Sequence, residues 1–140
     1  MKDFIISFIN EINQWELLSI EMDINLRQIS DDTHRKIKKV KCNEERKNKL
    51  IEIFNKFVSP SIMDSEYCSR LETLSYSRPP EFTSIEFLGV ETDKQGTAVV
   101  IKVDNIFAMR LKYYLIEEDN NFKIKSVYAF QNNKWNRYYL

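Results

Sequence analysis

Apolar residues recur at steps of three and four along the first 30 residues, which is the period of an amphipathic helix. The stripe comprises Phe4, Phe8, Ile12, Trp15, Leu18, Met22, Leu26 and Ile29, and it is widened by Ile5, Ile9, Leu17, Ile20 and Ile24. A face this broad is typical of a helix that packs against a sheet. Because a helix of this length would reach about 42 Å, we expect a bend or break between residues 18 and 24.

Two further helix starts are predicted downstream. One of residues 31–33 caps the first start, and Asn43, which is followed by two glutamates, is the signal for the second. Such side chains accept hydrogen bonds from the free N–H groups of a first turn, and acids suit its positive end. An apolar face over residues 50–58 follows. Pro60 ends this helix because proline disfavours helical geometry in the residue before it. Residues 61–74 are expected to hold a short helical turn.

After Pro80 the apolar period changes from 3.6 to two, which indicates strands. Ile85 and Phe87 alternate, and Gly89 then indicates a bulge. Further alternation covers residues 99–103, 107–115, 122–130 and 135–139, with polar turns at "TDKQG", "EDNN" and "QNNK". Four or five antiparallel strands are therefore predicted.

Helices followed by a run of strands define an α+β class, with N-terminal helices packed on a curved antiparallel sheet. We expect a single domain over residues 1–140, helical over about 1–74 and sheet over about 82–140. Pro79 and Pro80 lack N–H donors and cannot join a central ladder. They are expected to mark the transition from the helical layer to the sheet.

Composition narrows the function classes. Lys plus Arg and Asp plus Glu both number 21, so no electrostatic steering of the whole protein toward nucleic acid or membrane is expected. No apolar run approaches the roughly 20 residues that span a bilayer. The N-terminus begins like a signal peptide, but polar residues interrupt it and no cleavage site follows. We therefore expect a cytoplasmic protein with Cys42 and Cys68 as reduced thiols.

No catalytic, cofactor-binding or metal-binding residues are predicted. His34 is the only histidine and lies in a polar, basic stretch, so it is expected at the surface. With two isolated cysteines it cannot supply a zinc tetrad. The chain has two glycines and no phosphate-cradling loop. Of the strand carboxylates, Glu86 is expected to point to solvent. Asp104 is expected in a turn, with a general base inside a cone-shaped sheet as the alternative.

Two surfaces call for separate interpretations. The basic run over residues 35–49 is expected to be the exposed side of a helix, with a phosphate-binding patch as the alternative. Aromatic residues are abundant in the last third of the chain. Those that point outward from the strands, such as Tyr114 and Tyr138, would form an adhesive face, because tyrosine and tryptophan are enriched in protein interfaces.

Three stretches carry a family resemblance: "KLIEIFNKFVSP" (49–60), "SYSRPPEF" (75–82) and "RLKYYLIEEDNNFKIKSVYAFQNNKW" (110–135). They resemble the second helix, the paired-proline segment and the closing hairpins of bacterial immunity proteins of the nuclear-transport-factor-2-like fold. These proteins accompany polymorphic toxins. The chain departs from that pattern at Phe122, where tryptophan is common in the family.

The resemblance implies a non-enzymatic antitoxin, without a cofactor, that binds its cognate toxin in the cytoplasm. Neither nucleic acid nor membrane is an expected partner, and a homodimer through an exposed sheet face is an open expectation. The alternative is a small-molecule-binding or isomerase-like protein of the same cone fold. Acidic positions on the first helix and at the turns, together with aromatic and basic anchors, are the predicted partner-binding residues: Glu16, Glu21, Asp23, Tyr76, Arg78, Tyr114, Glu117, Glu118 and Tyr138.

Overall fold

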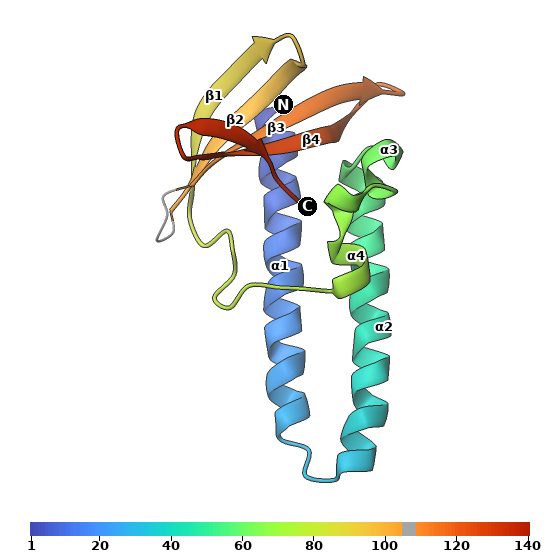
Figure 1. Ribbon diagram of the computed structural model, residues 1–140. Helices are drawn as coiled ribbons and strands as arrows, with labels where there is room; N and C mark the ends of the chain where they lie inside the picture. The colour runs from blue at the N-terminus through green and yellow to red at the C-terminus, as the bar shows by residue number, and fades with distance from the viewer. Residues whose placement is uncertain (105–108) are drawn as a thin grey trace.

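The computed structural model describes residues 1–104 and 109–140. The chain begins with two long antiparallel helices, α1 (Lys2–Arg27) and α2 (Asp32–Phe57). Figure 1 shows both helices starting or ending near the sheet and extending well beyond it. The far end of this helical hairpin therefore projects away from the strands, and only its near half contributes to the main core.

Helix α1 is continuous, so the bend expected between residues 18 and 24 is wrong. The prediction considered the length of one helix alone. In the structure, α2 has the same length of 26 residues and runs beside it. The distal half of α1 therefore has a packing partner beyond the sheet, where the indole of Trp15 donates a hydrogen bond to the Arg46 carbonyl at 2.8 Å.

Helix α2 starts as predicted from the cap at residue 31. The Asp31 side chain accepts from the N–H groups of Thr33 at 3.0 Å and His34 at 3.4 Å. The second start predicted at Asn43 is wrong, because Asn43 lies inside α2, where its side chain accepts from Arg46 at 3.2 Å. No glycine or proline separates the two capping signals, so one helix runs through both. It ends at Phe57, ahead of Pro60 as predicted.

Short helical pieces follow, as expected for residues 61–74. They are α3 (Pro60–Met63), a 3₁₀ turn η1 (Glu66–Cys68) and α4 (Arg70–Thr73). Residues 74–84, which we call the strap, then cross α1 to reach the first strand (Figure 1). The strap contains Pro79 and Pro80, and the peptide bond between Arg78 and Pro79 is cis. The paired prolines thus stand at the predicted transition from helices to sheet.

The rest of the chain forms an antiparallel sheet in which every strand pairs with its sequence neighbour. The strands are β1 (Ile85–Asp93), β2 (Gly96–Val103), β3 (Arg110–Glu118), β4 (Asn121–Gln131) and β5 (Lys134–Arg137). The predicted bulge interrupts β1 between Phe87 and Gly89. Two pairs of polar residues make the last two turns with positive φ: Asp119 with Asn120, and Asn132 with Asn133. The predicted α+β class is confirmed.

The strand predicted over residues 107–115 corresponds to β3, which starts at Arg110. Its inward positions Leu111, Tyr113 and Leu115 are buried as the alternation required. Phe107, the first residue of that prediction, lies outside the described residues. The alternation therefore gives the correct face for the described part of this strand.

The core lies between α1, α2 and the face of the sheet that we call the inner face. A run of aromatic contacts crosses this layer from helix to strand. The Phe8 ring centroid lies 5.5 Å from that of Phe57 and 6.1 Å from that of Tyr113. Where α2 ends, the Ser59 N–H donates to the Ile124 carbonyl of β4 at 2.9 Å. This bond ties the end of the helical hairpin to the sheet.

Candidate functional site

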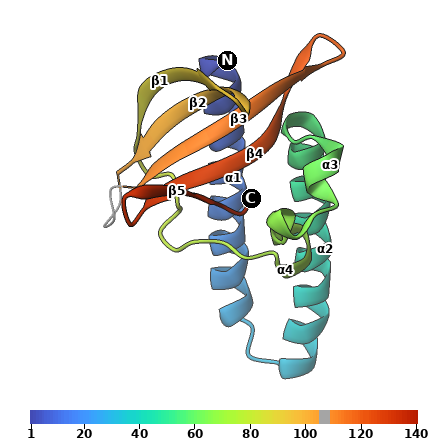
Figure 2. The same ribbon diagram turned by 45° about the horizontal axis from the view of Figure 1, so that its top comes forward.

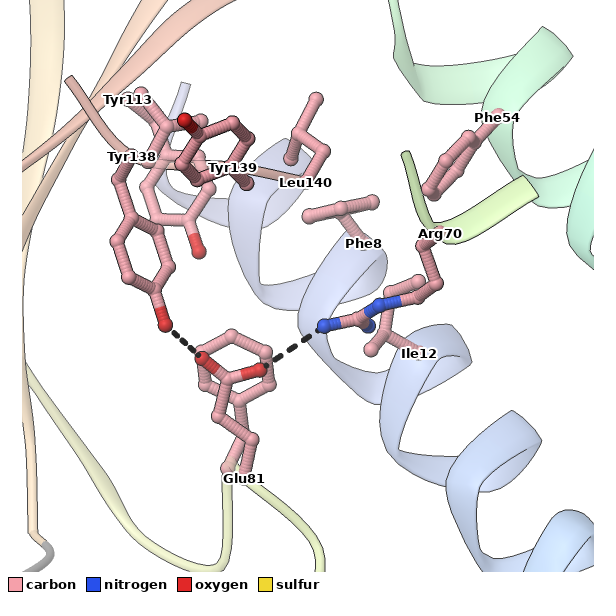
Figure 3. Close-up of a pocket in the computed structure, with 11 residues that line it drawn as sticks. Phe8, Ile12, Phe54, Arg70, Glu81, Tyr113, Tyr138, Tyr139 and Leu140 are labelled. Carbon is pink, nitrogen blue, oxygen red and sulfur yellow. Dashed lines mark hydrogen bonds and ion pairs between the residues drawn. The ribbon is translucent and has the colours of Figure 1, made fainter. Parts of the chain in front are cut away.

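The space between the inner face, α1 and the strap is almost filled by side chains. A cavity of about 10 Å³ remains there, lined by apolar groups and by Arg70, Glu81, Tyr113 and Tyr138 (Figure 3). A volume of this order holds about one water molecule. The interior of this sheet therefore has no room for a metabolite in the described conformation.

Glu81, on the strap, joins the last residues of the chain to α4. One carboxylate oxygen accepts from the Tyr138 hydroxyl at 2.9 Å, and the other lies 3.3 Å from Nη2 of Arg70 (Figure 3). Both members of the ion pair are largely shielded from solvent. Burial raises the pKa of Tyr138, and the neighbouring Glu81 carboxylate raises it further. The phenol is a donor at neutral pH, and Glu81, Tyr138 and Arg70 form what we call the Glu81 clamp.

Glu16, on α1, is a second carboxylate that holds the strap. It is fully buried, and its two oxygens accept from the backbone N–H groups of Ser77 at 2.5 Å and Glu81 at 3.3 Å. Burial raises the pKa of Glu16 because the charged form loses its hydration, and this effect exceeds the opposing effect of the hydrogen bonds. Its role in this geometry is to anchor backbone, because both oxygens are engaged.

We expect Glu16→Gln to change how stability depends on pH. Because the folded state raises the pKa of Glu16 above its ordinary value of 4.5, proton binding stabilises the folded protein. That stabilisation is present below 4.5 and is lost as the pH rises through the raised value. Glutamine does not titrate. The free energy of unfolding of the variant, relative to that of the wild type, should therefore increase as the pH rises from 4 to 7.5. Urea unfolding at a series of pH values measures this difference.

The control for this experiment is Glu21→Gln, which changes an exposed acid on the same helix. Its difference from the wild type should stay constant over the same pH range. If the difference in unfolding free energy between Glu16→Gln and the wild type is also constant, or if the variant becomes less stable relative to the wild type as the pH rises, the assignment of a raised pKa to Glu16 is wrong.

An open groove of about 870 Å³ lies on the solvent side of the Glu81 clamp. The strap and the described chain ends of β2 and β4 line it, including Asp104 and Gln131. Asp104 is exposed at the end of β2, and its N–H donates to the Ser84 carbonyl at 2.9 Å. The turn role predicted for Asp104 fits this position. Among the described lining residues, the carboxylate nearest the interior is Glu81, which is already paired on both oxygens.

The residues predicted for partner binding lie on several separate elements. The structure brings one pair together, since Nη1 of Arg78 lies 3.1 Å from the Asp23 carboxylate. Glu21 and Glu117 are exposed, on α1 and β3 respectively. Glu118 accepts from the Ser59 hydroxyl at 3.4 Å. Which of these surface positions contacts a partner stays a prediction.

Three of the predicted contact residues are less accessible than the prediction assumed. Glu16 is buried and faces the strap, where its carboxylate accepts from backbone N–H groups, so it is not a surface acid as expected. Tyr138 points toward the Glu81 clamp rather than outward (Figure 3). Tyr114 does lie on the sheet face away from the helices, but it is 3 % exposed, and its hydroxyl donates to Asp93. Strand alternation alone could not reveal these local partners.

The basic run over residues 35–49 is mostly exposed, as expected, and so is His34. Arg46 is the exception and is buried between the helices and the strap. Its guanidinium lies 5.1 Å from the Trp15 ring centroid and 5.0 Å from that of Tyr76. It also donates to Ser19 at 2.9 Å, to Asn43, and to the Leu74 carbonyl. This residue is therefore a structural cation and not part of a surface patch.

Sequence reasoning missed Arg70 and Glu81 as a pair. Eleven positions separate them, and no periodic pattern links a short helix to an irregular strap. It also missed Lys112, whose burial in β3 depends on aromatic neighbours two strands away. A lysine within the alternating run 111–115 was the available signal.

Cys42 and Cys68 are both free, and Cys68 is buried. Burial raises the pKa of the Cys68 thiol to about 11. Over residues 1–104 and 109–140, no cluster of histidine, cysteine and acidic side chains is arranged to hold a metal ion. In the same ranges, none of the helices combines the length and the apolar character that crossing a bilayer requires.

Comparison of the chain with protein-family models, with curated proteins and with solved structures gives no significant match.

Proposed function

We propose that this protein is a non-enzymatic antitoxin, an immunity protein that binds a cognate bacterial toxin in the cytoplasm. In this proposal it covers the active site or the substrate-access path of the toxin. The family resemblance to immunity proteins of the nuclear-transport-factor-2-like fold suggests this class. The observation that supports it best is the filled interior of the sheet. Its remaining cavity of about 10 Å³ holds about one water molecule, so a substrate would have only the open groove outside the Glu81 clamp.

The use of the buried charged groups is consistent with a binding protein. Glu16 and Glu81 fix the strap to α1, to α4 and to the end of the chain. A scaffold fixed in this way loses little conformational freedom on binding, which favours tight association. Complete neutralisation of a toxin requires a Kd of about 1 nM or below, which corresponds to roughly −12 kcal/mol.

The alternative function, a small-molecule-binding or isomerase-like cone protein, has less support. A general base needs a carboxylate within reach of a bound substrate. Glu16 has the raised pKa that such a base requires, but both of its oxygens accept backbone hydrogen bonds. Its carboxylate therefore faces the strap and not an open pocket.

Co-expression tests the proposal directly. The protein should restore growth to cells that produce the toxin encoded by the adjacent upstream gene. The two purified proteins should also elute as one complex from gel filtration. The rescue should persist when the inhibitor is Glu44→Gln, a substitution at an exposed position on α2 that is not among the predicted partner-binding residues. Failure of both rescue and complex formation would overturn the proposal.

A further inference from the structure

The sheet has a second face, the outer face, that no described helix covers. Figure 2 shows the strands in front of α1, with this face turned to the viewer. Directly opposed residues in antiparallel strands point to the same side. One row therefore crosses four strands as Val100, Lys112, Tyr128 and Arg137. The outer face thus carries bulky aromatic and basic side chains.

Side chains on this face bury one another without a covering layer. Lys112 is 7 % exposed, with its Nζ 3.0 Å from the Glu91 carboxylate and 4.3 Å from the Trp135 ring centroid. Phe130 packs on Trp135 at 5.3 Å. Their conformations are set before any partner arrives, so a partner would meet a preorganised aromatic surface. Tryptophan, tyrosine and arginine are the residues that most often dominate binding energy at interfaces.

The outer face also carries a small excess of cations. Its basic residues are Lys102, Arg110, Lys112 and Arg137, and its acids are Glu86, Glu91 and Asp93, with Glu86 directly opposite Lys102 and Asp93 engaged by the Tyr114 hydroxyl. Lys102 and Arg110 oppose each other there, and Arg137 lies at its far edge. Within residues 1–104 and 109–140, no carboxylate lies within ion-pair distance of these three cations. The acid Glu91 is already paired with Lys112. A partner that places carboxylates opposite these cations would gain electrostatic complementarity and faster association.

We propose that the outer face is the surface that binds the toxin, and that the toxin presents an acidic patch around an apolar site. This inference rests on the proposed function and assigns its interface. Five strands about 4.8 Å apart and about eight residues long give a face of about 600 Å². A typical partner buries about 800 Å² per side, so this face with its rim is large enough.

Other occupants fit this surface less well. A second copy in a two-fold dimer would bring the same excess of cations, four against three acids, to both sides of the interface. A single-stranded nucleic acid needs free ring faces for base stacking. Cations already lie over two of these rings. Nζ of Lys112 is 4.3 Å from the Trp135 ring centroid, and Cζ of Arg137 is 5.6 Å from the Tyr128 ring centroid. An acidic protein is therefore the occupant that the geometry favours.

The test uses a catalytically inactive form of the toxin encoded by the adjacent upstream gene as the titrant in calorimetry. Phe130 and Arg110 are exposed, so the double substitution Phe130→Ala with Arg110→Glu changes the surface and not the core. We expect it to weaken binding by about 100-fold or more, since anchors of this kind each contribute tenfold or more. Arg110→Glu alone should also slow association and flatten its dependence on salt.

The matched control is Ile37→Ala with Lys38→Glu, two exposed positions on α2. It repeats the same kinds of change on another face and should leave the affinity within about threefold of the wild type. Thermal unfolding confirms that both double variants remain folded.

The outcomes separate the inference from the proposed function. Loss of binding in the outer-face variant alone supports the inference. If the wild type binds and both variants bind equally well, the toxin binds elsewhere and the inference fails while the function stands. If the wild type does not bind, both fail. If light scattering gives a dimer mass that Arg110→Glu alters, the occupant of the outer face is a second copy and not an acidic protein. If the protein binds oligo(U) and Phe130→Ala removes this binding, the occupant is a single-stranded nucleic acid.

Discussion

Replacing Phe54 by alanine is expected to lower the free energy of unfolding by about 3–5 kcal/mol. Phe54 is fully buried on α2 and lines the small interior cavity opposite Phe8 and Tyr113. Truncation removes its apolar contacts and enlarges a space that the surrounding helices and sheet cannot close. Domains of this size are stable by only about 5–15 kcal/mol. Urea unfolding should show a lower midpoint with an unchanged slope.

The same substitution at Phe130 provides the comparison. Phe130 is 37 % exposed, and its main aromatic neighbour is Trp135. Losing this contact should reduce stability by about 1 kcal/mol at most. Similar losses at the two positions would mean that the layer between α2 and the sheet is not the main core. A small loss at Phe130 would also show that binding defects in this variant come from the surface.

The periodic parts of the fold could be predicted because burial on one side leaves a direct mark on the sequence. The stripe on α1 and the alternation in β3 gave the correct faces at Trp15 and Tyr113, which are both buried. The turns with Asp119 and Asn132 were predictable because asparagine and aspartate tolerate positive φ. Helix breaks were not predictable, since Asn43 carries a capping signal but lies inside the continuous helix α2.

The buried polar groups could not be predicted in the same way. Glu16 lies on the apolar face of α1, at the helical spacing of Ile5, Ile9 and Ile12, and a strap from 61 residues away covers it. Its partners are the backbone N–H groups of Ser77 and Glu81, and because every residue type except proline has such a group, no side-chain pattern predicts the contact between Glu16 and the strap. The outer face presents the same difficulty, because Lys112 is buried by Trp135, which reaches it across β4.

Replacing Arg46 by alanine is the second change with a large expected effect. Arg46 donates from α2 to Ser19 and Asn43 and to the Leu74 carbonyl at the start of the strap. Its removal leaves these acceptors unpaired in a shielded site and empties the space between the Trp15 and Tyr76 rings. We expect a loss of about 2–4 kcal/mol. The strap amides should also exchange hydrogen faster in the variant.

Two comparisons show what the guanidinium contributes. Arg46→Lys keeps the charge but replaces a planar fork of donors with a compact ammonium, so it should restore only part of the stability. Lys47→Ala, at the exposed neighbouring position, should change stability by less than about 0.5 kcal/mol. Full recovery with lysine would mean that charge alone matters at this site, which the three directed hydrogen bonds argue against.

The strap is held by both long helices, because Arg46 binds it from α2 at Leu74 and Glu16 binds it from α1 at Ser77. Groups that restrain one segment are expected to show non-additive effects. The double variant Arg46→Ala with Glu16→Ala, which removes the acceptors of the Ser77 and Glu81 N–H groups, should therefore lose less stability than the sum of the single losses, since a strap released at one end no longer holds the other contact in place. Additive losses would show that the two ends of the strap are fixed independently.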